Sequence, residues 1–259
     1  LPGIVNDFLD RILFRYFDTG AENWRSSLGI FQAATKLAVI MSLFVQMFRF
    51  AAEPFFFQRA GKKDNKELYA QVMEYFVAFC GLIFLGVILY IDVISLFLGR
   101  DFRAGIGVVP VMMLSYMLLG MLFNVSMWYK LSGKTSFAVY ITLAGLVVTA
   151  VVNIVFMPRF SYWASAFGHL SSYVVMLIVS VLLGNKYYPI PYKWGRILFF
   201  FLLAGAIYAV ADFMDRSFFS ADEISGILHG GQLAVKIILS TVLIIFYAAV
   251  SFLFLRRRK

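Results

Sequence analysis

Long apolar runs recur along the whole chain and decide what it can fold into. Crossing the roughly 30 Å hydrocarbon core of a bilayer takes about 20 helical residues. The strict alternation of a membrane barrel strand is absent from these runs, so only helices satisfy their backbone hydrogen bonds. The sequence therefore predicts an all-α polytopic membrane protein with seven complete spans, at 28–52, 71–98, 106–129, 137–157, 162–184, 196–214 and 232–255.

Residues 1–17 are apolar enough to be the outer end of an eighth spanning helix. Because the chain opens inside this apolar element, we expect that an N-terminal part precedes it. The connections between the seven spans are short, and each carries Gly, Pro or charged residues. None of them is long enough for a soluble catalytic domain.

Charge is scarce and is distributed between the apolar runs. Only 14% of the residues are charged, whereas soluble domains carry about 25%. The net charge of +9 therefore indicates membrane topology and argues against nucleic-acid binding.

Alternate connections differ in their content of Lys and Arg, which predicts orientation because basic residues favour the cytoplasmic side. The first set contains thirteen of these residues, namely Arg59, Lys62, Lys63, Lys66, Lys130, Lys134, Lys186, Lys193, Arg196, Arg256, Arg257, Arg258 and Lys259. The opposite set contains seven, namely Arg11, Arg15, Arg25, Arg100, Arg103, Arg159 and Arg216. We expect the first set, and with it the C-terminus, to be cytoplasmic.

The tripeptide Gly133-Lys134-Thr135 matches the end of a nucleotide-binding phosphate loop, whose spacing is G-x-x-x-x-G-K-[ST]. Trp128 stands where the first glycine is required, and no strand precedes the tripeptide. We therefore expect no nucleotide here. Instead, Gly133 makes a tight turn, and Thr135 or Ser136 caps the helix that follows.

Ionisable residues inside membrane spans are costly and usually mark a functional pathway. Lys36 lies about a third of the way into its helix, with Gln32 one turn earlier on the same face. We interpret this pair as lining a polar cavity. In the alternative, Lys36 reaches a partner residue or the outer membrane interface along its aliphatic stem.

Arg49 lies on one helical stripe with Gln46 and Ser42, and Glu53 follows four residues later on the same stripe. Arg49 and Glu53 either line the mouth of the cavity or form a structural ion pair. Lys236 is only a turn from a helix end, so the sequence favours snorkelling to the membrane interface.

Other polar residues in or near the spans fit structural roles. We interpret Asn124 and Asn153 as hydrogen-bonding groups between helices. His169 is either hydrogen-bonded structure or a protonatable group. Asp92 and Asp212 lie near helix ends, where carboxylates reach water. Cys80, the only cysteine, is a small packing residue inside an apolar run.

Four passages, in this order, resemble the C-terminal half of a bacterial polysaccharide (O-antigen type) flippase. This family belongs to the multidrug/oligosaccharidyl-lipid/polysaccharide exporter superfamily. The passages are NDFLDRILFRYF with LGIFQAATKLA, FRFAAEPFFFQRAGKKDNKE, VISLFLGRDFRAGIGVVPVMMLSYMLLGM and YKLSGKTSFAVYITLAGLVVTAVVNIVFMPRF. One stretch, FSYWASAFGHLSS, departs from the family, which has a Gly-rich pattern there.

The resemblance implies helices seven to fourteen of a two-lobe fold. Residues 1–184 would form the C-terminal six-helix lobe, and 185–259 two additional helices with a basic tail. It also implies that the first helix faces a central cavity. There Arg11 and Arg15 contact an anionic headgroup, unless Asp10 and Arg11 form a local pair and both arginines snorkel.

The implied function is alternating-access flipping of lipid-linked oligosaccharide across the bacterial inner membrane, without catalysis, cofactor or metal ion. The expected partners are this substrate, membrane lipids and an N-terminal lobe of the same polypeptide. The expected cavity residues are Arg11, Arg15, Gln32, Lys36, Gln46, Arg49 and Glu53.

Two alternatives remain. One is a multidrug or metabolite antiporter of the same superfamily, which would need cation-binding acids. The other is a membrane-bound glycosyltransferase or polymerase, which would need general acid/base groups on a substantial outer loop.

Overall fold

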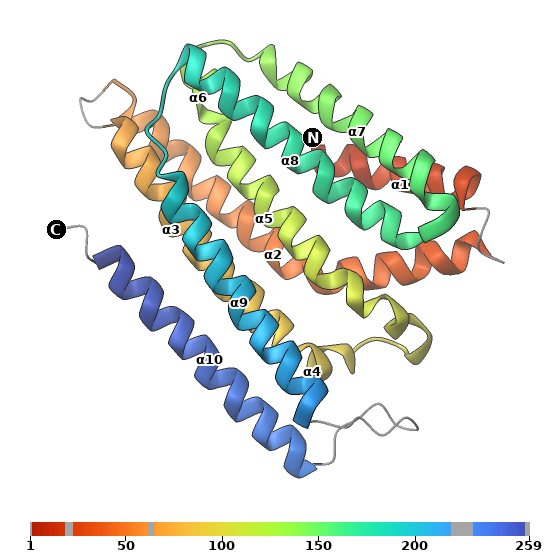
Figure 1. Ribbon diagram of the computed structural model, residues 1–259. Helices are drawn as coiled ribbons and strands as arrows, with labels where there is room; N and C mark the ends of the chain where they lie inside the picture. The colour runs from red at the N-terminus through yellow and green to blue at the C-terminus, as the bar shows by residue number, and fades with distance from the viewer. Residues whose placement is uncertain (1, 19–22, 62–64, 219–229, 257–259) are drawn as a thin grey trace. The chain divides into compact units, whose positions relative to one another are not determined.

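The computed structural model describes residues 2–18, 23–61, 65–218 and 230–256. Every regular element within these ranges is a helix, which confirms the predicted all-α fold, and Figure 1 labels the α-helices. The elements are α1 (Pro2–Phe17), α2 (Trp24–Arg59), α3 (Asn65–Ile88), α4 (Ile91–Ser95), the 3-10 helix η1 (Arg100–Val108), α5 (Val109–Val125), α6 (Met127–Leu131), α7 (Phe137–Phe160), α8 (Tyr162–Tyr187), α9 (Trp194–Phe218) and α10 (Gly230–Arg256).

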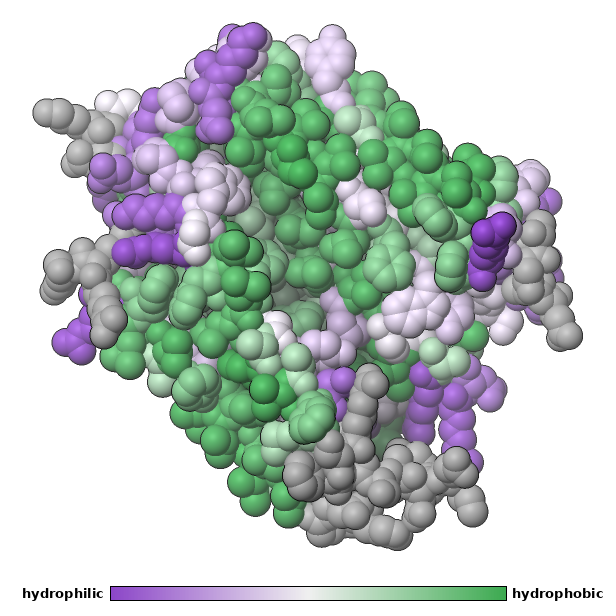
Figure 2. Space-filling view, in the orientation of Figure 1, coloured by the Kyte–Doolittle hydropathy of each residue, from purple (hydrophilic) through white to green (hydrophobic). Residues whose placement is uncertain are grey.

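Seven helical segments of the described chain are long and apolar enough to cross a membrane. They are Trp24–Arg59, Asn65–Ile88, Arg100–Leu131, Phe137–Phe160, Tyr162–Tyr187, Trp194–Asp215 and Ala234–Arg256. Figure 2 shows that hydrophobic side chains make up most of the visible surface. Since exposed apolar surface of this extent suits lipid and not water, the chain is a multi-pass membrane protein, as predicted.

Several spans differ in detail from the predicted ranges. The run at 71–98 is not one helix, because α3 ends at Ile88 and the short α4 follows. The run at 106–129 begins in η1 and continues through α5 into α6. Pro54 lies inside α2, which continues to Arg59. Proline at this point removes one backbone donor near the helix end.

The chain divides into two compact units. The first unit comprises Leu1–Met73 and Leu98–Tyr192 and contains α1, α2, α5, α7 and α8. The second unit comprises Glu74–Phe97 and Lys193–Lys259 and contains most of α3 with α9 and α10. The division into a lobe at 1–184 and two helices at 185–259 stays a prediction.

Helix pairs in the first unit approach closely at small residues. α7 packs against α8, and a Cβ atom on Gly145 would lie 2.6 Å from the Met176 Cγ of α8. Ser172 Oγ also donates to the Gly145 carbonyl oxygen across this contact, at 2.9 Å. Small residues and hydroxyl groups of this kind are what allow membrane helices to associate.

A second packing region of the first unit joins the end of α2 to the start of α3. Phe56 and Tyr69 meet edge to face with ring centroids 4.8 Å apart, and both are buried together with Met127 and Ile190. The Tyr69 hydroxyl donates to the Phe56 carbonyl oxygen at 2.8 Å. This bond satisfies one of the carbonyl groups that the last turn of α2 leaves without a helical partner.

The second unit is held by a buried tyrosine. Tyr247 of α10 is fully buried, and its hydroxyl donates to the Ala78 carbonyl oxygen of α3 at 3.1 Å. It packs in a cluster with Leu85, Ala204 and Ile207. Gly81 makes room for the ring, because a Cβ there would lie 2.7 Å from Tyr247 Cζ.

The turn between α6 and α7 contains the tripeptide at 133–135. Gly133 has a φ of +70°, a left-handed conformation that glycine adopts without steric cost. Ser136 occupies the N-cap of α7 but makes no side-chain cap hydrogen bond, so only the glycine part of the expected turn is observed. The Lys134 ammonium lies 3.7 Å from the centre of the Tyr187 ring.

Candidate functional site

The polar residues of α2 fall into two groups along the helix. Gln32 and Lys36 are four residues apart, and Ser42, Gln46 and Arg49 follow further along at spacings of four and three. Lys36 and Arg49 are thirteen positions apart, which corresponds to about 20 Å along the helix at 1.5 Å per residue. This length covers much of the thickness of the hydrocarbon core. We call the broad side of α2 that carries both groups its polar face.

This face forms one wall of a cavity of about 640 Å³ within the first unit. α1 and α5 provide the other walls. The lining residues are Asp10, Arg11, Leu28, Phe31, Gln32, Thr35, Lys36, Val39, Ser42, Gln46, Arg49, Tyr116, Leu119 and Phe123. The cavity brings together five of the seven residues that sequence reasoning selected, namely Arg11, Gln32, Lys36, Gln46 and Arg49.

Arg11 and Lys36 carry exposed side chains at one part of this cavity. Neither has a carboxylate within ion-pair distance among the described residues. No carboxylate of the described chain therefore forms an ion pair with either charge. Two such cations in a helical membrane domain make the cavity attractive to an anion.

Arg49 is held at the other part of the cavity by aromatic rings. Its guanidinium carbon lies 4.9 Å from the ring centre of Phe123 and 5.2 Å from that of Phe50. Its Nε is buried and has no hydrogen-bond partner within the described chain. Cation–π contact holds the guanidinium group in place without neutralising its charge.

Glu53 does not pair with Arg49, so the local ion pair that the sequence left open is not formed. The Glu53 carboxylate instead accepts from the Lys130 ammonium of α6. Glu53 does not line the cavity. Arg15 also lies outside it, exposed, with its guanidinium 5.7 Å from the Tyr16 ring centre.

Asp10 does not pair with its neighbour Arg11 either. It is 2% exposed, and its Oδ2 lies 2.7 Å from Nε2 of the fully buried His169. Asp10 Oδ1 and the Ser165 hydroxyl are 3.0 Å apart, and that hydroxyl is also 3.0 Å from Asn153 Oδ1. We call Asp10, Asn153, Ser165 and His169 the Asp10 cluster.

The other polar candidates have structural contacts. Lys236 does not reach the interface alone, because it donates to the carboxylates of Asp92 and Asp215, the latter at 2.6 Å. Asn153 bonds between helices as expected, within the Asp10 cluster. Asn124 instead bonds within its own helix, to the Gly120 carbonyl oxygen at 3.4 Å.

Sequence reasoning missed Glu74, which is fully buried in α3 within a candidate span. Its carboxylate lies 3.5 Å from the Arg196 guanidinium of α9, in the second unit. An acidic residue inside an apolar run, such as Glu74, can be found in the sequence and indicates a structural or functional role within the span. The basic residues Lys62, Lys63, Arg257, Arg258, Lys259 and the expected outer connection at 219–229 lie outside the described residues.

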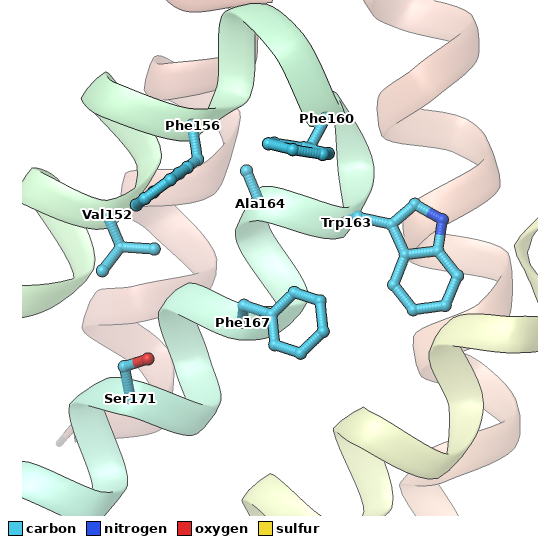
Figure 3. A pocket seen from close by; sticks show the side chains of 7 residues that line it. All are labelled: Val152, Phe156, Phe160, Trp163, Ala164, Phe167 and Ser171. Atoms are coloured by element: carbon cyan, nitrogen blue, oxygen red, sulfur yellow. The ribbon is translucent and has the colours of Figure 1, made fainter.

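A second cavity of about 480 Å³ is apolar and lies at the junction of α7 and α8. Figure 3 shows Phe156 and Phe160 of α7 near Trp163 and Phe167 of α8. It has no charged lining residue. Its chemistry therefore differs from that of the cation-lined cavity.

The cation-lined cavity is suited to hold an anionic group. Among the described residues, no three His, Cys, Asp or Glu side chains are grouped to hold a metal ion. The charged groups available there are Arg11, Lys36, Arg49 and the buried Asp10. No protein-family model, curated protein or solved structure matches this chain.

Proposed function

We propose that this protein is a membrane transporter that flips lipid-linked oligosaccharide across the bacterial inner membrane by alternating access. The observation that carries the proposal is the cavity between α1, α2 and α5, lined by Arg11, Lys36 and Arg49. Its cations have no carboxylate partners within the described chain. The four passages that resemble polysaccharide flippases support a phosphate-linked sugar headgroup as this anion.

The position of the cations supports transport. Leaving a charged side chain in contact with lipid in the middle of a span is costly. Lys36 is nonetheless exposed on α2, well inside the helix. Its open side must therefore meet water or another protein segment. We propose that a second lobe of the same polypeptide faces the cavity and that the two lobes alternate around it.

The length of the polar face also supports movement of a headgroup through the bilayer. Lys36 and Arg49 are about 20 Å apart along α2, and Ser42 and Gln46, which line the same cavity, lie between them in the helix. An anionic headgroup can therefore move from contact with Lys36 to contact with Arg49 without entering lipid. The sugar headgroup would occupy the cavity, while its lipid chain stays in the membrane.

A cation antiporter of the same superfamily is the second candidate. The observation that favours it is the buried Asp10 carboxyl in the cavity wall. A transport assay with cationic dyes separates the two functions. Accumulation of dye in cells that lack the protein, and its extrusion when the protein is restored, would support the antiporter.

Substitution of the cavity cations tests the flippase proposal. Because a charge-assisted hydrogen bond contributes about 1.5–3 kcal/mol, Lys36→Ala or Arg49→Ala should lower polysaccharide export by about tenfold or more. Export is measured by surface polysaccharide in cells whose own gene is deleted, with protein abundance checked by immunoblot.

Arg25→Ala is the matched control, since Arg25 lies on the same helix but does not line the cavity. Lys36→Arg should retain export because it keeps the charge. Full polysaccharide export by both alanine variants, at normal protein abundance, would contradict the proposal that the cavity holds the substrate.

A further inference from the structure

Three lysines of the first unit converge on two consecutive tyrosines at the end of α8. The ammonium groups of Lys134 and Lys186 lie 3.7 Å and 5.6 Å from the centre of the Tyr187 ring. The ammonium group of Lys66 lies 4.6 Å from the centre of the Tyr188 ring. These lysines come from the start of α3, the turn before α7 and the last turn of α8. We call the three lysines and two tyrosines the lysine–tyrosine site.

The Tyr187 ring is held in place by a buried tryptophan. It is stacked on Trp128, with ring centres 5.9 Å apart and an angle of 13° between the ring planes. Trp128 is 1% exposed, and its indole N–H donates to the Ser180 hydroxyl oxygen of α8 at 3.1 Å. Gly184 leaves room for the indole, since a Cβ there would lie 3.0 Å from Trp128 Cδ1. The fold therefore fixes the ring that two of the lysines contact.

Tyr188 is held by contacts of its own. Its hydroxyl oxygen accepts from Asn65 Nδ2 of α3 at 3.3 Å, and its backbone N–H donates to the Gly184 carbonyl oxygen at 2.8 Å. Asn65 directly precedes Lys66, so the start of α3 both supports the ring and brings the third lysine to it. The two tyrosines thus gather cations from three segments of the chain at one end of α8.

The charges of these lysines are not used in ion pairs. None of the three has a carboxylate within ion-pair distance among the described residues. Contact with a tyrosine ring attracts an ammonium group but leaves its positive charge. Lys134 and Lys186 are exposed, and Lys66 is half-buried. The lysine–tyrosine site is therefore a concentration of positive charge that an anion can reach.

The predicted topology does not by itself require this arrangement. An excess of lysine on one side orients the spans wherever the lysines lie on that side. Lys193 belongs to the same predicted side and is exposed, but it has no cation–π contact within the described chain. Lys130 is paired with Glu53. The convergence of the other three lysines is therefore a property of the tertiary structure.

The position of the site indicates which anion it meets. Tyr187 is the last residue of α8, a helix long and apolar enough to cross a membrane. Tyrosine at the end of such a helix lies at the level of the lipid headgroups. Basic pockets between the ends of membrane helices bind the headgroups of anionic phospholipids. A phospholipid phosphate is thus the anion present at this level of the bilayer.

We propose that the lysine–tyrosine site binds the headgroup of an anionic phospholipid of the surrounding membrane. The ammonium groups of Lys66, Lys134 and Lys186 contact the headgroup, and the acyl chains stay in the bilayer. Because the rings already hold the lysines near one another, less side-chain freedom is lost when the lipid binds. The bound lipid links the start of α3, the turn before α7 and the end of α8.

This lipid site is separate from the cation-lined cavity. None of its five residues lines that cavity. The proposal therefore does not rest on the proposed function, and a loss of polysaccharide export in the cavity variants would say nothing about it.

Native mass spectrometry of the full polypeptide, purified in detergent and titrated with lipid, tests the proposal. We expect phosphatidylglycerol, whose headgroup is anionic, to bind more tightly than phosphatidylcholine, whose headgroup has no net charge. Lys134→Gln and Lys186→Gln should each weaken phosphatidylglycerol binding by about fivefold, the effect of one basic residue at an anionic surface. Binding of phosphatidylcholine should not change. Both side chains are exposed, so thermal unfolding should show that the variants remain folded.

Two further variants separate the arrangement of the lysines from their number. Lys193→Gln is the matched control, because it removes an exposed lysine of the same predicted side that lies outside the site. It should leave phosphatidylglycerol binding unchanged. Tyr187→Leu keeps every lysine but removes the ring that two of them contact, so it should weaken binding. Tyr187→Phe keeps the face of the ring and should retain binding.

Three results would overturn the proposal. The first is equal affinity for the two lipids, and the second is an equal loss of phosphatidylglycerol binding in Lys193→Gln and in the two variants of the site. The third is displacement of phosphatidylglycerol by an excess of inorganic phosphate, which would assign the site to a soluble phosphate.

Discussion

Two pairs of neighbouring opposite charges in the described helices, Arg49 with Glu53 and Asp10 with Arg11, do not form ion pairs. Glu53 lies one turn from Arg49, yet its carboxylate contacts Lys130, 77 residues later in the sequence. Arg49 packs on Phe123 instead. Asp10 likewise contacts His169, 159 residues away, and not Arg11. Glu53 and Asp10 contact residues on other helices, so neither forms an ion pair with the arginine next to it on its own helix.

The Glu53–Lys130 pair should contribute modestly to stability. Its side chains are 34% and 27% exposed, and solvent screens a pair of this kind, so we expect a coupling free energy of about 1 kcal/mol or less. A double-mutant cycle with Glu53→Gln and Lys130→Met, measured by thermal unfolding in detergent, gives this value. The exchanged pair, Glu53→Lys with Lys130→Glu, should recover the stability that either single exchange loses; no recovery would contradict a direct ion pair.

The sequence predicts which residues share a helix face, but not the contacts between helices. Gln32 and Lys36, four residues apart, share a face by helical periodicity, which the sequence contains. That Arg49 lines the same cavity depends also on how α1 and α5 pack against α2. The contacts of Lys236 with Asp92 and Asp215 depend on how α10 meets α4 and α9. The sequence near Lys236 contains no pattern that predicts which helices pack together. Snorkelling was therefore the simpler expectation for Lys236.

At the scale of elements, hydropathy predicted that each span exists but not where it is interrupted. The run at 71–98 is apolar throughout, yet α3 ends at Ile88 and α4 begins at Ile91. Hydropathy averaged over a window of residues stays high across such a break, so it does not reveal where the helix ends. The all-α fold and seven spans were predictable because lipid requires an internally bonded backbone. The interruptions depend on tertiary packing.

Gly81 should be intolerant of any side chain, because it accommodates Tyr247 in the second unit. Gly81→Ala would force the ring away from α3 and break its bond to the Ala78 carbonyl oxygen. We expect a loss of about 1–3 kcal/mol in unfolding free energy, as for other overpacked cores. Thermal unfolding in detergent measures it.

Gly205→Ala, in α9, is the control, since a Cβ there has open space. Adding Tyr247→Phe to Gly81→Ala should restore part of the loss, because the hydroxyl is the group closest to the new methyl group. Equal stability of the single and double variants would argue against this contact.

At the scale of the whole molecule, the distribution of Lys and Arg predicts which ends of the spans face the cytoplasm. Cys80 is the only cysteine and is buried, so it should not react with a membrane-impermeant maleimide. Lys134→Cys and Arg159→Cys lie at opposite ends of α7. In intact spheroplasts, we expect labelling at position 159 and none at position 134 until the membrane is opened. The reverse pattern would invert the predicted topology.

A single residue joins the two helices that close one side of the first unit. α7 ends at Phe160, α8 begins at Tyr162, and Ser161 between them has a φ of +47°. Two steps along the backbone span at most about 7 Å, so these helix ends cannot part. Any tilt of α8 must therefore move the end of α7 with it. Asn153 of α7 and Ser165 and His169 of α8, three members of the Asp10 cluster, then move together.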